Sequence, residues 1–190
     1  MLRRAVLFLA CLWSLSAAAA PPRTGDDGRG PGFRFGVGAG PAVHVALRPA
    51  DIAGTAYPGI VVPLRLGYQF RYPVGLYAEP FAFLGFRGGA LDVSFGGALV
   101  LQMNAGRHFR FAVGPSVSAI YLCPDCEPLP RTGGLFGGFV TRLGLDILVR
   151  TRPSDGHAHA LSLDLDVRPS FGPAGGAFLL VGAVLGYDSY

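Results

Sequence analysis

The sequence predicts an all-β fold, an eight-stranded antiparallel up-and-down barrel. Apolar residues alternate with polar or small ones over long stretches, as they do in a strand, where successive side chains point to opposite faces. The connections carry turn chemistry rich in Gly, Pro, Asn and Asp. Runs of helical period that follow a capping box are nearly absent. A chain that is 51% hydrophobic and only 15% charged is also unlike a disordered one.

The N-terminal region is predicted to precede the folded domain. Residues 1–19 have a basic start, an apolar middle and a small-residue end with Ala17 and Ala19, which is the layout of a secretory signal peptide. Residues 20–32 are rich in Gly, Asp and Pro and are expected to form a flexible leader. Loss of Arg3 and Arg4 with the signal lowers the formal charge from +4 to +2. A chain this close to neutral gives no argument for nucleic-acid binding.

Residues 33–190 are expected to form the barrel, in eight alternating stretches. These are residues 33–47, 59–71, 75–86, 90–104, 107–121, 135–150, 158–171 and 176–187. The first alternates Phe and Val with Gly, and the second sets Val, Leu, Tyr and Phe against Arg and Gly. The third is ambiguous, because Glu79 shares its register with Tyr77, Phe81 and Phe83. We expect a register flip at Pro80 that turns the two phenylalanines outward; the alternative is an apolar interior patch able to accept an acyl chain.

The remaining stretches continue the pattern. The fourth opposes Leu, Val and Phe to Asp, Ser and Gly, and the fifth keeps its alternation for about twice the ordinary strand length of 5–6 residues. The sixth and seventh oppose Leu, Ile and Val to Arg, Asp and Gly, whereas the eighth is apolar on both faces. Connections after the second, fourth and sixth stretches are short, and those after the first and fifth are long.

The direction of the apolar face follows from length and charge. Stretches of this length exceed the 9–11 residues that a tilted strand needs to cross a bilayer. The minor face combines charges of both signs with many glycines, and an eight-stranded barrel has an interior only wide enough for side chains. Buried charges need partners. We therefore predict a transmembrane barrel whose lumen holds an ion-pair network of Arg65, Glu79, Asp92, Arg110, Arg142, Asp146, Asp164, Asp166 and Arg168.

This architecture resembles the small eight-stranded outer-membrane barrels, such as the OmpA transmembrane domain and OmpX. The resemblance covers roughly residues 33–190 and rests on architecture alone. It implies a terminal aromatic residue that the barrel-assembly machinery recognises, and Tyr190 is the candidate for this residue. However, Tyr187 lies in the outward register and Tyr190 in the inward one. Either a bulge near Asp188 is needed, or Tyr187 is the recognised aromatic residue.

Signals for chemistry are few. Cys123 and Cys126 lie in a Pro-rich loop and are expected to form a disulfide in an oxidising compartment. No second Cys pair or nearby His-x-His supplies further zinc ligands. A His-x-Ser pair is absent, and His108 is too far along its strand from Ser116 to act on it. We expect no metal, no cofactor and no catalytic residues, and enzymatic activity has only weak support.

The sequence thus predicts an exported protein of the bacterial outer membrane with periplasmic ends and a structural or surface-interaction role. Its narrow, plugged lumen excludes a general porin. Expected partners are outer-membrane lipid and the barrel-assembly machinery, with no nucleic acid and a monomeric state. Two alternatives stay open: a lipid-acting enzyme or acyl-binding outer-membrane barrel, and a secreted soluble barrel of the lipocalin kind.

Overall fold

A computed structural model describes residues 31–48, 53–71, 73–106, 108–123, 132–152, 157–172 and 175–189. Its strands are β1 (Gly32–Arg48), β2 (Ala56–Arg71), β3 (Val74–Arg87), β4 (Ala90–Ala105), β5 (Phe109–Cys123), β6 (Thr132–Arg152), β7 (His157–Phe171) and β8 (Ala177–Ser189). The expected signal peptide, most of the leader, Cys126 and Tyr190 lie outside the described residues, as does the side chain of Cys123. The described part contains no helix long and apolar enough to cross a membrane.

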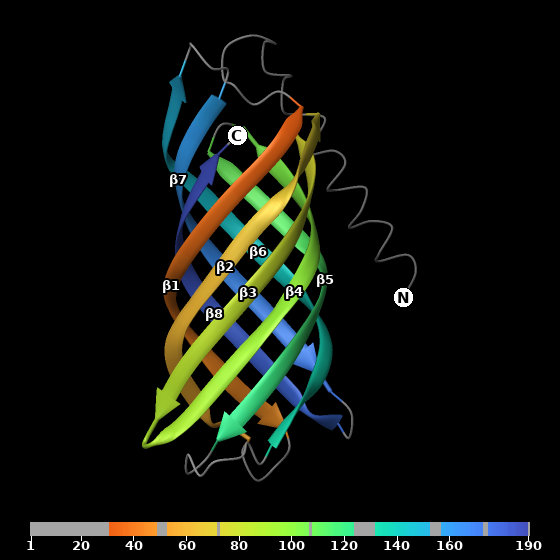
Figure 1. The fold of residues 1–190 in the computed structure, drawn as a ribbon, viewed down its shortest axis with the longest axis vertical. Helices are drawn as coiled ribbons and strands as arrows, with labels where there is room; N and C mark the ends of the chain where they lie inside the picture. The colour runs from red at the N-terminus through yellow and green to blue at the C-terminus, as the bar shows by residue number, and fades with distance from the viewer. Residues whose placement is uncertain are drawn as a thin grey trace.

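The strands form one closed antiparallel barrel in sequence order, as predicted. Each strand pairs with its neighbours along the chain, and β1 closes on β8 with Phe35 opposite Ser189 (Figure 1). The start of β1 and the end of β8 therefore lie at the same end of the barrel. We call this the terminal end, and the other the distal end.

The turn between β3 and β4 shows how local sequence sets the pairing. It consists of Gly88 and Gly89, with φ angles of 53° and 90°. Two consecutive positive φ angles fit the tight hairpin turn whose twist matches that of the strands, and glycine adopts them without a steric cost. This turn keeps the pairing of β3 with β4 continuous from Arg87↔Ala90 to Val74↔Met103.

Exposure alternates along most of each strand with the predicted period of two, and the pairing shifts register near the ends of β1 and β2 and within β6. In β6 the register shifts between Asp146 and Leu148, and Ile147 and Leu148 are both exposed on the outside. Two residues then oppose one on β7, as in a β-bulge. Val149, the next residue after the shift, is half-buried and packs against the buried Ala160.

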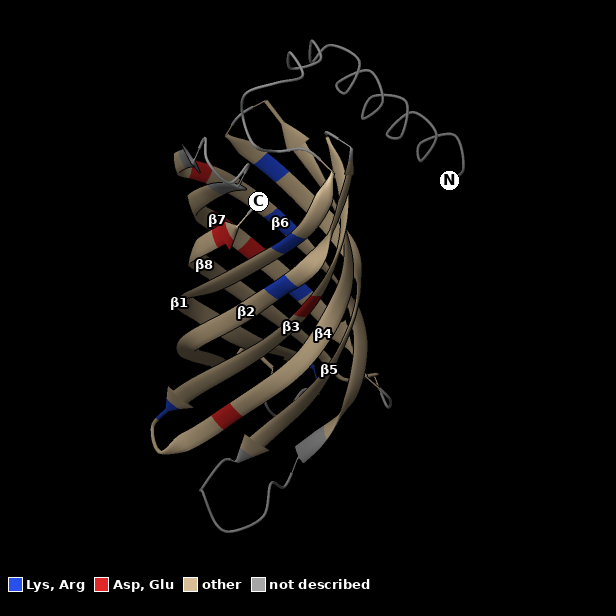
Figure 2. Ribbon diagram, turned by 45° about the horizontal axis from the view of Figure 1, so that its top comes forward, with Lys and Arg blue, Asp and Glu red and all other residues tan. Residues whose placement is uncertain are grey.

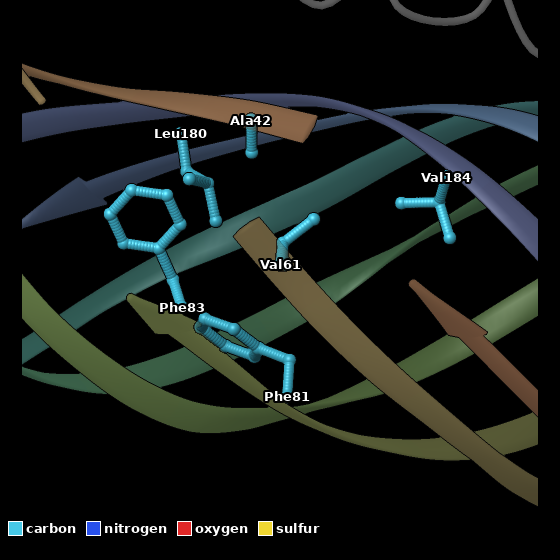
Figure 3. Close-up of a cluster of buried hydrophobic side chains, with 6 residues drawn as sticks. All are labelled: Ala42, Val61, Phe81, Phe83, Leu180 and Val184. Atoms are coloured by element: carbon cyan, nitrogen blue, oxygen red, sulfur yellow. The ribbon is translucent and has the colours of Figure 1, made fainter. Parts of the chain in front are cut away.

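The barrel interior contains apolar clusters as well as charges. One of them joins residues of β1, β2, β3 and β8 and is called here the lumen patch (Figure 3). A second cluster lies toward the distal end, around Tyr57, Ile120 and Phe178. The lumen patch consists of Ala42, Val61, Phe81, Phe83, Leu180 and Val184.

Candidate functional site

The outer surface of the barrel is apolar along its length. Leu99 is 53% exposed and Leu143 is 57% exposed, and similar side chains cover all eight strands. Monomeric proteins in water rarely present contiguous apolar surface on this scale. The direction of the apolar face is therefore the one that a lipid-facing barrel requires, and the reverse of that in a soluble barrel.

Aromatic side chains stand on this surface near the terminal end. Tyr68 and Phe70 at the end of β2 have ring centroids 5.7 Å apart, and Phe109 at the start of β5 is 63% exposed. On β8, the Tyr187 hydroxyl lies 2.6 Å from Nδ1 of His159, and the two rings stack. Aromatic girdles of this kind flank the apolar band of outer-membrane barrels.

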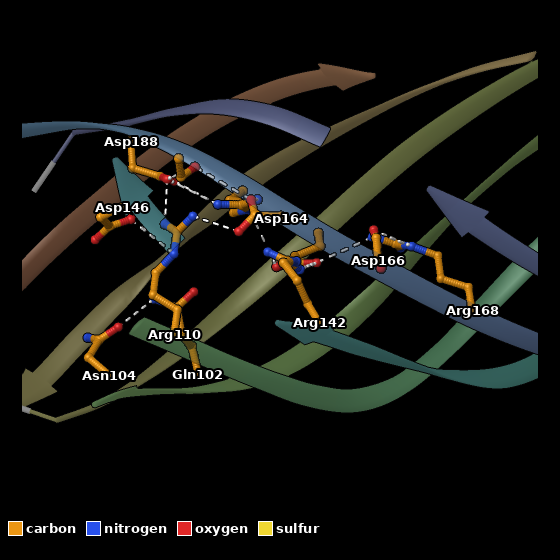
Figure 4. A network of polar contacts seen from close by, with 12 residues as sticks. Gln102, Asn104, Arg110, Arg142, Asp146, Asp164, Asp166, Arg168 and Asp188 are labelled. Carbon is orange, nitrogen blue, oxygen red and sulfur yellow. Dashed lines mark hydrogen bonds and ion pairs between the residues drawn. The ribbon is translucent and has the colours of Figure 1, made fainter. Parts of the chain in front are cut away.

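Four charged residues form a closed ring inside the barrel. The Arg65 guanidinium donates to Asp188 through Nη1 at 3.0 Å and also contacts Asp164. The Arg110 guanidinium donates to Asp164 through Nη2 at 2.8 Å and also contacts Asp188. Each arginine thus contacts both carboxylates, and all four side chains are buried. Figure 4 labels three of them, Arg110, Asp164 and Asp188. We call this set the four-residue ring.

A second ionic group adjoins the ring on its distal side. Glu79 contacts Arg142 and lies 3.5 Å from Nη2 of Arg168 and 3.9 Å from Nε of Arg65. Arg168 donates to Asp166 through Nε at 3.0 Å and Nη2 at 2.7 Å. Glu79 therefore joins the two groups through Arg65.

A neutral polar layer lies in the lumen toward the terminal end. Gln69 donates to the carbonyl of Val74 at 2.6 Å and accepts from the Tyr77 hydroxyl at 3.2 Å and from Asn104 at 3.4 Å. Gln102 donates to Asn104 at 3.1 Å. These amides occupy the space beside the four-residue ring, and Figure 2 shows most charged segments in the terminal half of the barrel.

The predicted network residues fall into two places. The structure brings together Arg65, Glu79, Arg110, Arg142, Asp146, Asp164, Asp166 and Arg168. Asp146 joins through Nε of Arg110 at 3.3 Å. Asp92 does not pair with an arginine as expected, because it lies toward the distal end, where its partner is His44.

Asp188 is the member of the network that sequence reasoning missed. An outward Tyr190 would need a bulge near this residue. The described pairing shows no shift there, since Asp188 faces Gly36 and Tyr187 faces Val37 in an unbroken register. The inward register of β8 therefore carries Asp188 into the lumen, and simple alternation from Val184 would have found it.

A buried constellation at the distal end brings together His44, Asp92 and Ser94. Nδ1 of His44 lies 2.5 Å from Asp92 Oδ2 and 3.5 Å from the Ser94 hydroxyl, which donates to Asp92 Oδ1 at 3.0 Å. The imidazole packs between Phe83 and Phe178. A nucleophilic serine needs the ring nitrogen opposite the one held by the carboxylate. Here both groups approach Nδ1, so the arrangement clamps the imidazole and does not activate Ser94.

The phenylalanines of β3 point inward, so the expected register flip is wrong. Phe81 is 7% exposed and Phe83 is 1% exposed, and β3 keeps an unbroken alternation from Gly75 to Gly85. The reason is that Glu79 lies in the lumen among arginines. Phe81 and Phe83 have the same parity on β3, so they point into the lumen as well. The guanidinium of Arg168 lies 4.4 Å from the Phe81 ring centroid, which is a favourable cation–π distance.

Metal-ligating side chains do not cluster in the part of the chain that the structure describes. Within it, no group of three or more His, Cys, Asp or Glu residues is arranged to hold a metal ion. The carboxylates of the network are instead engaged by guanidinium groups, as the four-residue ring illustrates.

Comparison with known proteins gives a fold and no family. No protein-family description matches the chain, and no curated protein matches it. Among solved structures, Neisserial surface protein A (NspA) superposes with a TM-score of 0.52 at 9% identity, over 84% of this chain and 97% of that one. The fold is that of a small eight-stranded outer-membrane barrel. The outer membrane protein OprG from Pseudomonas aeruginosa matches with a TM-score of 0.49 at 13% identity, over 87% of this chain and 99% of that one.

Proposed function

We propose that the chain is an integral protein of a bacterial outer membrane, with a closed lumen and a structural or surface-interaction role. The observation that carries this proposal is the inside-out distribution of polarity. Large apolar side chains cover the outside, whereas Arg65, Arg110, Asp164 and Asp188 are buried inside. This arrangement is stable in a bilayer and unfavourable in water. The same distribution speaks against a secreted soluble barrel.

The content of the lumen favours a barrier over a general porin. The four-residue ring, the second ionic group and the neutral polar layer lie in its terminal half, and the lumen patch lies farther toward the distal end. Eight-stranded barrels leave an interior that side chains can fill, whereas porins need sixteen or more strands for an aqueous channel. Bulk passage of solutes would require breaking several buried ion pairs.

The proposed orientation puts the terminal end in the periplasm. The connections there, after β2, β4 and β6, are short, and those after β1 and β5 at the distal end are longer. Outer-membrane barrels have short periplasmic turns and longer external loops. The proposal includes export by the signal peptide of residues 1–19 and insertion by the barrel-assembly machinery. In this orientation the longer loops are available for surface contacts.

Cell fractionation and conductance measurements test the proposal. The expressed chain should fractionate with the outer membrane and migrate faster on a gel before boiling than after it. In planar bilayers the protein should show no porin-sized conductance, and the double variant Arg110→Ala/Asp188→Ala should conduct more than the parent because it removes side chains from the ring. Recovery of the folded mature chain in detergent-free buffer, or a large conductance of the parent, would overturn it.

An acyl-binding barrel is the second candidate, favoured by one specific observation. The lumen patch places Phe81, Phe83 and Leu180 inside a barrel whose other buried contents are mainly polar. Binding sites for apolar ligands are lined mainly by such side chains with a few polar groups nearby, and His44 adjoins Phe83. Retention of a radiolabelled fatty acid by the purified barrel, lost in Phe83→Asp, would support this candidate over a purely structural role.

A further inference from the structure

Pairing in the barrel wall is interrupted at three consecutive seams around β1 and β2. On each, two residues per strand lack a partner although the register is the same on both sides. Each gap contains a proline, Pro41, Pro63 or Pro80, and proline has no N–H to donate to the ladder. The interrupted pairs are residues 40–41 with 183–184, residues 38–39 with 62–63, and residues 64–65 with 79–80.

These gaps differ from the others in the barrel. Pro115 coincides with a gap between β4 and β5, and Pro169 with one between β6 and β7. In both cases the neighbouring seams, β3–β4, β5–β6 and β7–β8, are continuous through the same region. Among the described pairings, only the sector from β8 through β1 and β2 to β3 has such gaps on adjacent seams, so its strands are held by fewer ladder hydrogen bonds on both sides.

The lumen patch lies directly behind this sector. Its members Ala42, Val61 and Phe81 follow or precede the gaps by one or two residues, and Val184 lies within one. β1 presents only small residues here, and a side chain added at Gly38 would come within 2.5 Å of Val184 Cγ1. Little more than the backbone of β1 therefore separates the patch from the outside of the barrel.

We propose that this sector is a lateral portal through which one acyl chain passes between the bilayer and the lumen patch. The proposal rests on the membrane location argued above. An acyl chain is the expected ligand because hydrocarbon lies outside the wall and apolar side chains lie inside it. The wall between them has fewer hydrogen bonds to break. The ionic groups of the terminal half and the His44–Asp92 pair at the distal end bound the patch along the barrel axis, and a side entrance reaches the patch without crossing either of them.

Photocrosslinking in vesicles tests the portal. The folded protein is reconstituted with a phospholipid that carries a diazirine in one acyl chain or, in a second arm, with a diazirine fatty acid, and labelled residues are identified by mass spectrometry. Labelling of outward Leu64 and Leu185 reports membrane embedding. Labelling of Phe83 or Leu180 in either arm reports entry, and the arm that labels them identifies the source of the chain.

Proline variants connect the labelling to the gaps. Pro63→Ala, alone or with Pro41→Ala, supplies the missing donor and should lower labelling of the lumen patch several-fold, with outward labelling unchanged. Pro115→Ala is the matched control on a distant seam and should leave patch labelling as in the parent. Outward labelling without any patch labelling in the parent, or equal patch labelling in Pro63→Ala and the parent, would overturn the portal and leave the membrane proposal standing. Absence of outward labelling would overturn the membrane proposal itself.

Discussion

Replacement of Asp164 by asparagine tests the ionic interior most directly. The side chain of Asp164 is fully buried and accepts from Arg110 at 2.8 Å while also contacting Arg65. Asparagine has nearly the same shape, so the substitution removes a charge and little else. The change leaves Arg65 and Arg110 with Asp188 as their remaining shared carboxylate.

The magnitude follows from the two guanidinium contacts that lose their negatively charged partner. A hydrogen bond to a charged group contributes about 1.5–3 kcal/mol, and removal of one partner from a buried ion pair costs about 3–5 kcal/mol. The amide of Asn can still accept one bond, and both arginines keep Asp188. We therefore expect the free energy of unfolding to fall by about 3 kcal/mol, at the lower end of that range.

Urea unfolding in phospholipid vesicles, followed by far-ultraviolet circular dichroism, measures this change. Arg48→Gln is the control, because Arg48 is exposed at the end of β1 and such substitutions stay within about 0.5 kcal/mol. If Asp164→Asn destabilised the barrel no more than Arg48→Gln, water would have to solvate the ring, and the reasoning from buried pairs would fail.

Three further substitutions probe other parts of the barrel. Leu99→Arg, near the middle of β4, should cost about 2–4 kcal/mol and Phe109→Arg at the rim about 0–1 kcal/mol in the same assay; equal costs would contradict a lipid-facing wall. Asp92→Asn should destabilise the barrel less in a His44→Leu background than alone, by a coupling of about 0.5–3 kcal/mol in a double-mutant cycle, and additive effects would show that the pair does not interact. Phe83→Ala should cost about 3–5 kcal/mol because it leaves a cavity in the lumen patch, and a loss below about 1 kcal/mol would indicate a loosely packed patch.

The fold was predictable because its main determinant is local. Alternation over long stretches defines which residues of a strand share a face, and turn residues define where strands end. The exceptions are residues whose inward or outward direction is set by pairing with another strand. The bulge at residues 146–148 inserts one residue opposite β7, and it leaves both Ile147 and Leu148 outside. Both are apolar, so the sequence of β6 alone does not reveal the shift.

The site was partly predictable for a related reason. Parity places Arg65, Arg110 and Asp164 on one face, but it does not tell which charges meet across the lumen. Asp92 shares that face and yet lies at the distal end with His44. For β3 the sequence favours a register flip at Pro80 over an apolar interior patch, whereas the inward position of Glu79 obliges Phe81 and Phe83, which have the same parity, to point inward as well.

The pairing of β1 with β8 has a consequence for how the chain assembles. Every other seam joins strands that are consecutive in sequence, whereas this one joins Phe35 to Ser189. Loop-closure entropy makes such a distant contact slow to form. Until it forms, β1 and β8 each expose an unpaired edge that a bilayer does not tolerate. Assembly therefore ends in a single all-or-none closure, and loss of β8 should leave an open sheet rather than a smaller barrel.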